Sequence, residues 1–225
     1  MTRRYLTVAL LMSVVVCTGA FAFGGWAVVT VEDVPEYLVA GESVPLSFVV
    51  RQHGVTRLNG LSPSVTLRSG STSETIDARA NGATGRYVAS LKAPRAGEWT
   101  ITVNSGFGPS KTTMLPLKAV ASGTPAPAAL ATADRGQHLF VAKGCTTCHV
   151  RGAFGTDGFK DGPDLTSRRY VAAELGKFLS DPERSPLARP NTGQLRMPNL
   201  GLRDQEITAL VSYLNADVRV STRNP

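Results

Sequence analysis

The pentapeptide Cys145-Thr146-Thr147-Cys148-His149 places two cysteines three residues apart and a histidine directly after them. Cysteines at this spacing lie on one face of a helical turn, so both sulfur atoms can reach the two vinyl groups on one edge of a porphyrin. The next residue, His149, then directs an imidazole at the iron. The spacing predicts a covalent attachment site for one haem, in which Cys145 and Cys148 form thioethers and His149 binds the iron.

Two other kinds of site use a Cys-x-x-Cys pair, namely a redox-active dithiol and half of a zinc site. A dithiol motif needs a βαβ context, and a zinc site needs a second pair of ligands. The sequence supplies neither, because the remaining cysteine, Cys17, lies in an apolar N-terminal segment and the remaining histidines are His53 and His138. Haem attachment is therefore the favoured interpretation.

The sixth position of the iron needs a ligand, and Met197 is the candidate. Met1 and Met12 lie near the N-terminus and Met114 lies in the N-terminal half of the chain. A thioether ligand favours the reduced iron and raises the potential, which suits an electron carrier. The adjacent Pro198 stiffens the loop, as a ligand position would require, although a methionine can also simply fill a gap in a core.

Three motifs and a closing helix together resemble a class I c-type cytochrome domain over about residues 131–217. The motifs are Gly144-Cys145-x-x-Cys148-His149, Gly162-Pro163-Asp164-Leu165 and Met197-Pro198. The resemblance implies an all-α fold, a haem ligated by His149 and Met197, and a hydrogen bond from the other ring nitrogen of His149 to the carbonyl of Pro163. Such a bond fixes the tautomer and the orientation of a ligating imidazole.

Hydrophobic periodicity predicts three helices in this part of the chain. In the cytochrome family the first and last helices cross at a glycine flanked by aromatic residues, and the resemblance gives these parts to Gly136, Phe140 and Tyr213. The predicted helices span Ala133–Lys143, Arg169–Ser180 and Arg203–Asn215.

The N-terminus resembles a bacterial export signal. Arg3 and Arg4 precede an uncharged run over residues 5–23, which contains an Ala-x-Ala site ending at Ala22. Residues 1–22 are predicted to be a cleaved signal peptide or, since the run is long enough to cross a bilayer, an uncleaved membrane anchor. Both interpretations place the haem on the periplasmic side of the cytoplasmic membrane. A lipoprotein site at Cys17 is disfavoured because a small residue does not precede it.

Residues 23–118 have the sequence pattern of an all-β domain, in which short segments rich in strand-forming residues are separated by turn residues. The runs from Gly85 to Leu91 and from Ala96 to Val103 are similar to the last strands of small immunoglobulin-like exported domains of the YtkA-like kind. This similarity implies a seven-stranded sandwich with Tyr87 and Trp99 in or near the core. The predicted strands include Ala27–Val31, Val44–Val50, Ser64–Leu67, Arg86–Leu91, Trp99–Val103 and Thr112–Leu117.

Some exported immunoglobulin-like β-domains bind copper, which makes His53 and Met114 candidate ligands. One histidine and one methionine are too few for a copper site. We therefore expect His53 to occupy a turn and Met114 to pack along a strand. The domain shows no acid–base pair, nucleophile or phosphate loop, and is interpreted as a docking, spacer or assembly module.

Residues 119–131 join the two domains. They carry no charge and are rich in Ala and Pro, as a linker would be. Extended like polyproline at about 3.1 Å per residue, they would reach about 40 Å, so that the cytochrome domain at 132–220 could swing on its tether. The alternative is that the two domains pack together.

The formal net charge is +7 and falls to about +5 if Arg3 and Arg4 are removed with a signal peptide. No basic stretch interleaved with aromatic residues indicates nucleic-acid binding, so the charge suits docking to acidic redox proteins. Three arginines are candidates for pairing with haem propionates, because a guanidinium matches a carboxylate. They are Arg168, Arg169 and Arg196.

The sequence thus predicts an exported monohaem c-type cytochrome, an electron carrier rather than an enzyme, working between a redox donor and a redox acceptor. A second hypothesis is a fixed haem subunit of a larger respiratory or photosynthetic complex in the membrane. A third is a haem enzyme or gas sensor, which would need an open sixth position on the iron; Met197 argues against it.

Overall fold

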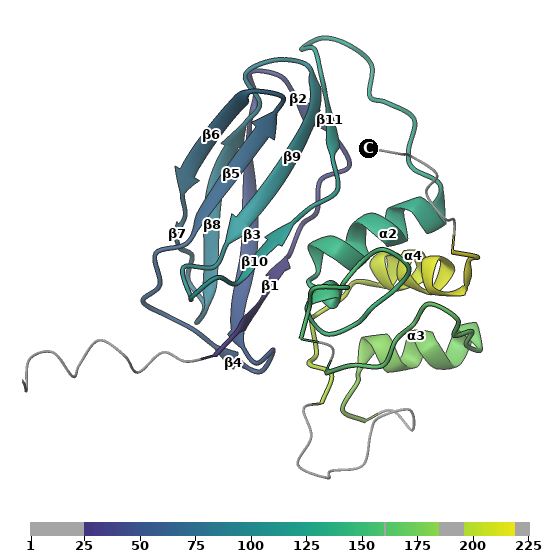
Figure 1. Ribbon diagram of the computed structural model, residues 1–225. Coiled ribbons are helices and arrows are strands. Elements are labelled where there is room, and N and C mark those ends of the chain that lie inside the picture. Colours follow the sequence, from purple (N-terminus) through teal and green to yellow (C-terminus); the bar gives the residue numbers. More distant parts are fainter. Residues whose placement is uncertain (1–24, 160, 185–195, 219–225) are drawn as a thin grey trace, which may run out of the picture.

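The computed structural model describes residues 25–159, 161–184 and 196–218, which form a β-sandwich and a helical domain side by side (Figure 1). The predicted signal peptide or anchor at 1–22, including Cys17, lies outside the described residues. In the part of the chain that is described, no helix is long and apolar enough to cross a membrane.

The N-terminal domain is an all-β sandwich of two sheets. One sheet has the strand order β1-β3-β8-β7, with β4 paired to β3, and the other has the order β2-β11-β9-β5-β6, with β10 paired to β9. Strand β11 runs parallel to β2, whereas the other pairs are antiparallel. The strands are β1 (Ala27–Val31), β2 (Leu38–Val39), β3 (Ser43–Gln52), β4 (Thr56–Arg57), β5 (Ser64–Ser69), β6 (Thr72–Asp77), β7 (Arg79–Ala80), β8 (Arg86–Lys92), β9 (Gly97–Asn104), β10 (Lys111–Thr113) and β11 (Leu117–Val120).

Alternating apolar residues fill the space between the sheets, as the period of a strand requires. Trp99 and Tyr87 lie in this core, as predicted, with polar atoms that are paired: Trp99 Nε1 donates to the carbonyl of Arg95 at 3.0 Å, and Tyr87 Oη donates to that of Leu58 at 2.8 Å. Met114 is also buried in this core.

The strand prediction fails in two places. The sandwich has more strands than the seven expected, because short or polar strands such as β6 lack an alternating apolar pattern. The predicted strand Thr112–Leu117 is also two strands, β10 and β11, separated at residues 114–116. Pro116 lies in this break, and a proline has no N–H to donate to a continuous ladder.

In its described residues, the C-terminal domain has three α-helices and a short 3₁₀ turn. The expected second helix begins later than Arg169, because residues just before it bind the end of α4: Tyr170 N donates to Asn215 Oδ1 at 2.8 Å, and Arg169 pairs with Asp217 at 2.8 Å. The elements are α2 (Thr132–Ala142), η2 (Cys145–Thr147), α3 (Ala172–Ser180) and α4 (Asp204–Asn215).

Helices α2 and α4 cross in the way that the family resemblance implied. Gly136 of α2 lies directly against the carbonyl of Ala209, where a Cβ atom would overlap that oxygen. The rings of Phe140 and Tyr213 pack beside this point, with their centroids 5.6 Å apart. The C-terminal end of α2 leads directly into the attachment turn.

The outward face of strands β1 and β3 is covered by the helical domain. An antiparallel sheet commonly leaves one face to water. Here Val28, Thr30 and Val49 point away from the sandwich core and yet are at most 3% exposed. At the edge of this interface, the backbone of Gly144 comes so close to Val29 that a Cβ atom would lie 2.6 Å from the Val29 oxygen. The two domains therefore pack together, despite the linker.

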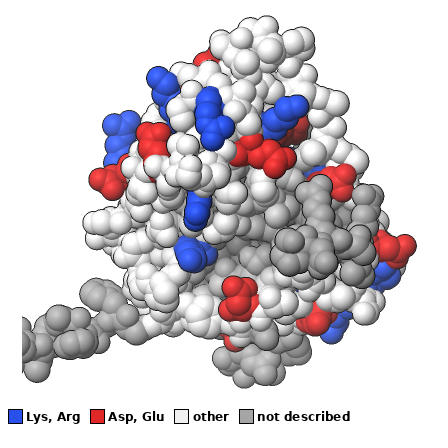
Figure 2. Space-filling view, turned by 45° about the horizontal axis from the view of Figure 1, so that its top comes forward, with Lys and Arg blue, Asp and Glu red and all other residues white. Residues whose placement is uncertain are grey.

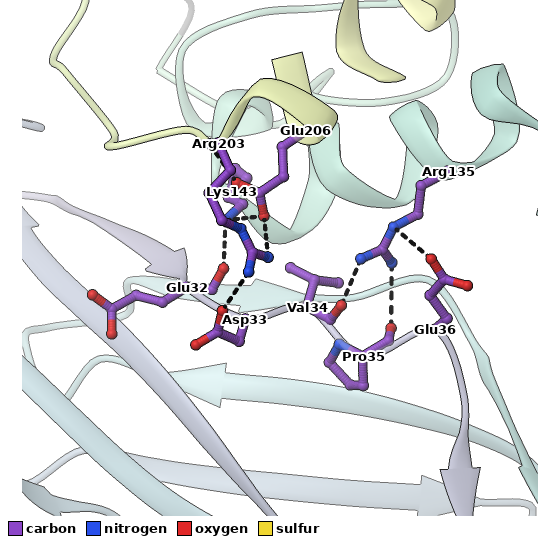
Figure 3. A network of polar contacts seen from close by, with 9 residues as sticks. All are labelled: Glu32, Asp33, Val34, Pro35, Glu36, Arg135, Lys143, Arg203 and Glu206. Carbon is purple, nitrogen blue, oxygen red and sulfur yellow. Dashed lines mark hydrogen bonds and ion pairs between the residues drawn. The ribbon is translucent and has the colours of Figure 1, made fainter. Parts of the chain in front are cut away.

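A polar network also joins the domains (Figure 3). Three cationic side chains of the helical domain, Arg135, Lys143 and Arg203, reach the segment 32–36 that follows β1. Lys143 is also paired with Glu206 of α4 at 2.8 Å. The interdomain contacts are Lys143 Nζ to Glu32 O at 2.6 Å, Arg203 to Asp33 at 3.0 Å, and Arg135 to Val34 O at 2.6 Å, to Pro35 O at 3.3 Å and to Glu36 at 3.7 Å.

Candidate haem site

The attachment motif forms a compact turn at the end of α2. Gly144 ends the helix with a left-handed φ of 79°, and η2 follows at once. The amides of Cys148 and His149 both donate to the carbonyl of Cys145, at 3.1 and 2.9 Å. Both cysteines and the histidine line one cavity as a result.

The two thiols lie in surroundings that keep them protonated. Burial, reinforced by the neighbouring Cys148, raises the pKa of Cys145 to about 12, and burial and Asp161 raise the pKa of Cys148 to about 11. A redox-active dithiol needs a lowered pKa. Among the described residues, no group of three or more His, Cys, Asp and Glu side chains converges as a metal site would require. The raised pKa values are the opposite of what a redox-active dithiol requires.

His149 is held by the loop that follows it. Its Nδ1 lies 2.9 Å from the carbonyl oxygen of Pro163, which is the contact that the resemblance implied. In this arrangement Nδ1–H donates, and the lone pair for binding a metal is on Nε2. Gly162 packs so tightly against the imidazole that a Cβ atom there would overlap the ring. The Gly162-Pro163 pair thus fixes the orientation of the ring from two sides.

The cavity has a volume of about 340 Å³ and a mainly apolar lining, within the range of cofactor pockets. Met197 lies on its wall together with both cysteines and His149. This donor set fits a covalently bound haem: two thiols for the vinyl groups, an imidazole and a thioether for the iron, and an apolar surround for the porphyrin. The leucine and phenylalanine residues of this lining are Phe140, Leu165, Leu175, Phe178, Leu179, Leu202, Leu210 and Leu214.

The three candidate arginines have different positions. Arg168 and Arg196 line the cavity, where each has an exposed side chain able to meet a carboxylate. Arg169 points elsewhere and pairs with Asp217. Only the first two therefore remain candidates for the propionates.

The β-sandwich contributes three residues to the cavity wall, which the sequence reasoning missed. Trp26, His53 and Gly54 line it alongside the haem-domain residues. The Trp26 ring stacks on Phe159 with centroids 4.7 Å apart and meets the His53 ring edge-on at 5.4 Å. His53 does lie in a turn, as expected, but that turn borders the haem site. No local pattern could reveal this, because the contact is between domains.

Arg151, two residues after His149, is a second residue that the sequence reasoning missed. It is 1% exposed and donates to three backbone carbonyls, those of Leu165, Tyr213 and Ala216, at 2.7–2.8 Å. It therefore ties the loop that carries His149 to the end of α4. A buried arginine so close to the attachment motif is visible in the sequence, but its partners are not.

Residues 133–216 match the family model for cytochrome c. This part of the chain is a c-type cytochrome domain, and the match implies one covalently attached haem c with its iron. No curated protein matches the chain.

Several solved structures are similar to parts of the chain. The Lin-41 filamin domain is 14% identical, with 44% of this chain and 86% of that chain covered and a TM-score of 0.28. Domains 4 and 5 of the S-layer protein SbsC are 18% identical, with 41% and 51% covered and a TM-score of 0.29. A superoxide reductase (neelaredoxin) from Ignicoccus hospitalis is 10% identical, with 47% and 88% covered and a TM-score of 0.28.

Proposed function

We propose that the protein is an exported monohaem cytochrome that carries single electrons between two redox proteins, with His149 and Met197 as the residues that would bind the iron. The observation that carries the proposal is the convergence of Cys145, Cys148, His149 and Met197 on one apolar cavity. The haem supplies the one-electron chemistry when it is bound.

The chain's own residues set the conditions for that chemistry. The hydrogen bond to Pro163 increases the basicity of the His149 imidazole and fixes its direction. The Met197 thioether would favour the reduced iron, and the mainly apolar lining would act in the same sense. A methionine ligand in the sixth position suits outer-sphere electron transfer better than binding of a substrate at the iron.

The proposed setting is the periplasmic side of a bacterial cytoplasmic membrane, and it rests on the signal-like residues 1–22. The partners proposed are redox proteins with acidic docking surfaces, because the chain is basic overall. On the face seen in Figure 2, acidic and basic side chains are interspersed, so the proposed attraction rests on the net charge of the chain.

Visible and near-infrared spectra of the protein matured with haem test the ligation directly. Oxidised wild-type protein should show the sulfur-to-iron charge-transfer band and bind cyanide slowly, whereas the Met197→Ala variant should lose the band and bind cyanide rapidly. If the wild-type protein lacks the band and binds cyanide or carbon monoxide at once, the iron is open, and catalysis or gas sensing becomes the better explanation.

A further inference from the structure

The turn between β3 and β4 is held in one conformation by its own hydrogen bonds. The amide of Val55 donates to Gln52 O at 3.0 Å, and His53 and Gly54 between them have φ values of 51° and 75°. Positive φ at both central residues is the requirement of a type I′ hairpin turn. The amide of His53 also donates to Trp26 O at 3.0 Å, which joins the turn to the start of β1.

This turn touches the segment that carries the proposed sixth ligand. A Cβ atom on Gly54 would lie 3.3 Å from Cγ and 3.7 Å from Cδ of Pro198, so the turn and the proline ring are already in close contact. Pro198 follows Met197 directly. Because residues 196–203 have no regular secondary structure, their position depends on what they pack against. The β-sandwich supplies one such surface.

We propose that the β3–β4 turn is a positioning element for the haem: Gly54 holds the Met197-Pro198 segment in place, while Trp26 and His53 close the adjoining wall of the cavity against small ligands. This inference rests on the proposed ligation by Met197. It gives the β-sandwich a function at the iron, where sequence reasoning offered only docking, spacing or assembly.

The interdomain contacts make this function physically feasible. A β-sandwich that forms part of the cavity wall can act on the haem only if it keeps a fixed position relative to the cavity. The polar network at segment 32–36 and the buried outer face of β1 and β3 hold the sandwich against α2 and α4. The turn therefore meets Pro198 from a fixed direction, and the linker at 119–131 does not determine where the domains lie.

The decisive experiment compares Gly54→Ala with Gly60→Ala in the full-length, haem-loaded protein. Both glycines have a left-handed φ, of 75° and 70°, so both substitutions introduce similar backbone strain. Only at Gly54 would the new Cβ press on Pro198, because nothing lies within 4 Å of a Cβ at Gly60. We expect Gly54→Ala to weaken the sulfur-to-iron band and to accelerate cyanide binding about tenfold, and Gly60→Ala to change neither.

A second pair of variants tests the wall and does not depend on the stability of the Gly54 variant. Trp26→Ala should accelerate cyanide binding while the sulfur-to-iron band persists, because it opens the cavity without displacing Met197. Val55→Ala, in the same turn but with a side chain 61% exposed, should leave the rate unchanged.

The outcomes separate the inference from the proposed function. If the wild-type protein lacks the sulfur-to-iron band, the proposed ligation is wrong. If the wild-type band is present, but Gly54→Ala behaves like Gly60→Ala and Trp26→Ala behaves like Val55→Ala, the ligation stands and the role of the β-sandwich at the iron is rejected.

Discussion

Arg151 shows how one side chain can stabilise a cofactor loop. Its guanidinium donates to carbonyls from the loop after His149 and from the end of α4, and it also lies over the Tyr213 ring at 4.8 Å. Burial lowers its pKa, and contact with Tyr213 opposes that shift. A planar fork of several donors can serve carbonyls in different directions, whereas a lysine ammonium is a compact point charge.

We expect Arg151→Met to destabilise the haem-loaded protein by about 3 kcal/mol, because one buried and two half-buried carbonyls lose a charged donor. Arg151→Lys should recover only a small part of the loss. Denaturant unfolding followed at the haem absorption band measures both. Arg68→Met is the control: this exposed arginine of β5 makes one long bond, 3.4 Å, to Gly70 O. Equal effects at the two arginines would rule out the bracing role of Arg151.

At the scale of the element, the crossing of α2 and α4 depends on a missing side chain. Glycine normally weakens a helix interior by about 1 kcal/mol relative to alanine. Glycine is nevertheless required at position 136, because the carbonyl of Ala209 lies where the Cβ atom of any other residue would be. Gly176, in α3, has no such constraint, since the nearest atom to a Cβ there is Ile207 Cγ2, at an ordinary 3.8 Å.

Alanine substitutions at these two glycines should therefore act in opposite directions. Gly136→Ala should destabilise the protein by about 2 kcal/mol through forced separation of the helices. Gly176→Ala should stabilise it by about 1 kcal/mol through helix propensity. Thermal unfolding of the haem-loaded variants shows whether each substitution raises or lowers the stability. A gain in stability at Gly136 would mean that the two helices do not cross as closely as described.

At the scale of the whole molecule, the buried pair of Lys143 and Glu206 links both domains, since Lys143 also binds Glu32 O. Burial lowers the pKa of Lys143 despite the attraction of Glu206. Burial raises the pKa of Glu206, but hydrogen bonds from Lys143 and Arg203 outweigh it, so the net direction is down.

A lowered folded-state pKa means that Glu206 stabilises the fold above its unfolded value of about 4.3, and that this contribution is lost as the pH falls through the folded-state pKa. Lys143→Met leaves the carboxylate buried and raises its pKa. We expect it to destabilise the protein by about 3 kcal/mol at pH 7 and to shift the acid-induced loss of stability to higher pH.

The double variant Lys143→Met, Glu206→Leu is the matched control, because it removes both charges and should regain most of the stability lost in the single variant. Unfolding midpoints measured between pH 3 and pH 8 report both effects. If the single and double variants were equally unstable and had the same pH profile, the pair would not act as a buried ion pair.

The features that could be read from residues alone are those that depend on local geometry. Cys145, Cys148 and His149 fall within a single turn, so their spacing alone predicts haem attachment. Helices α2, α3 and α4 lie within three residues of their predicted bounds at each end, because a helical apolar period reports the burial of one face. The alternation of apolar and polar residues likewise predicted β3 and β9, which lie in the interior of their sheets.

Tertiary structure alone decided how the domains meet and what completes the haem cavity. Trp26, His53 and Gly54 precede the attachment motif by about ninety residues or more, and no spacing rule relates such distant positions. The linker composition is compatible with both a swinging and a packed arrangement. The choice between them depends on whether the outer face of β1 and β3 finds a complementary surface, and that surface exists only after α2 and α4 have crossed.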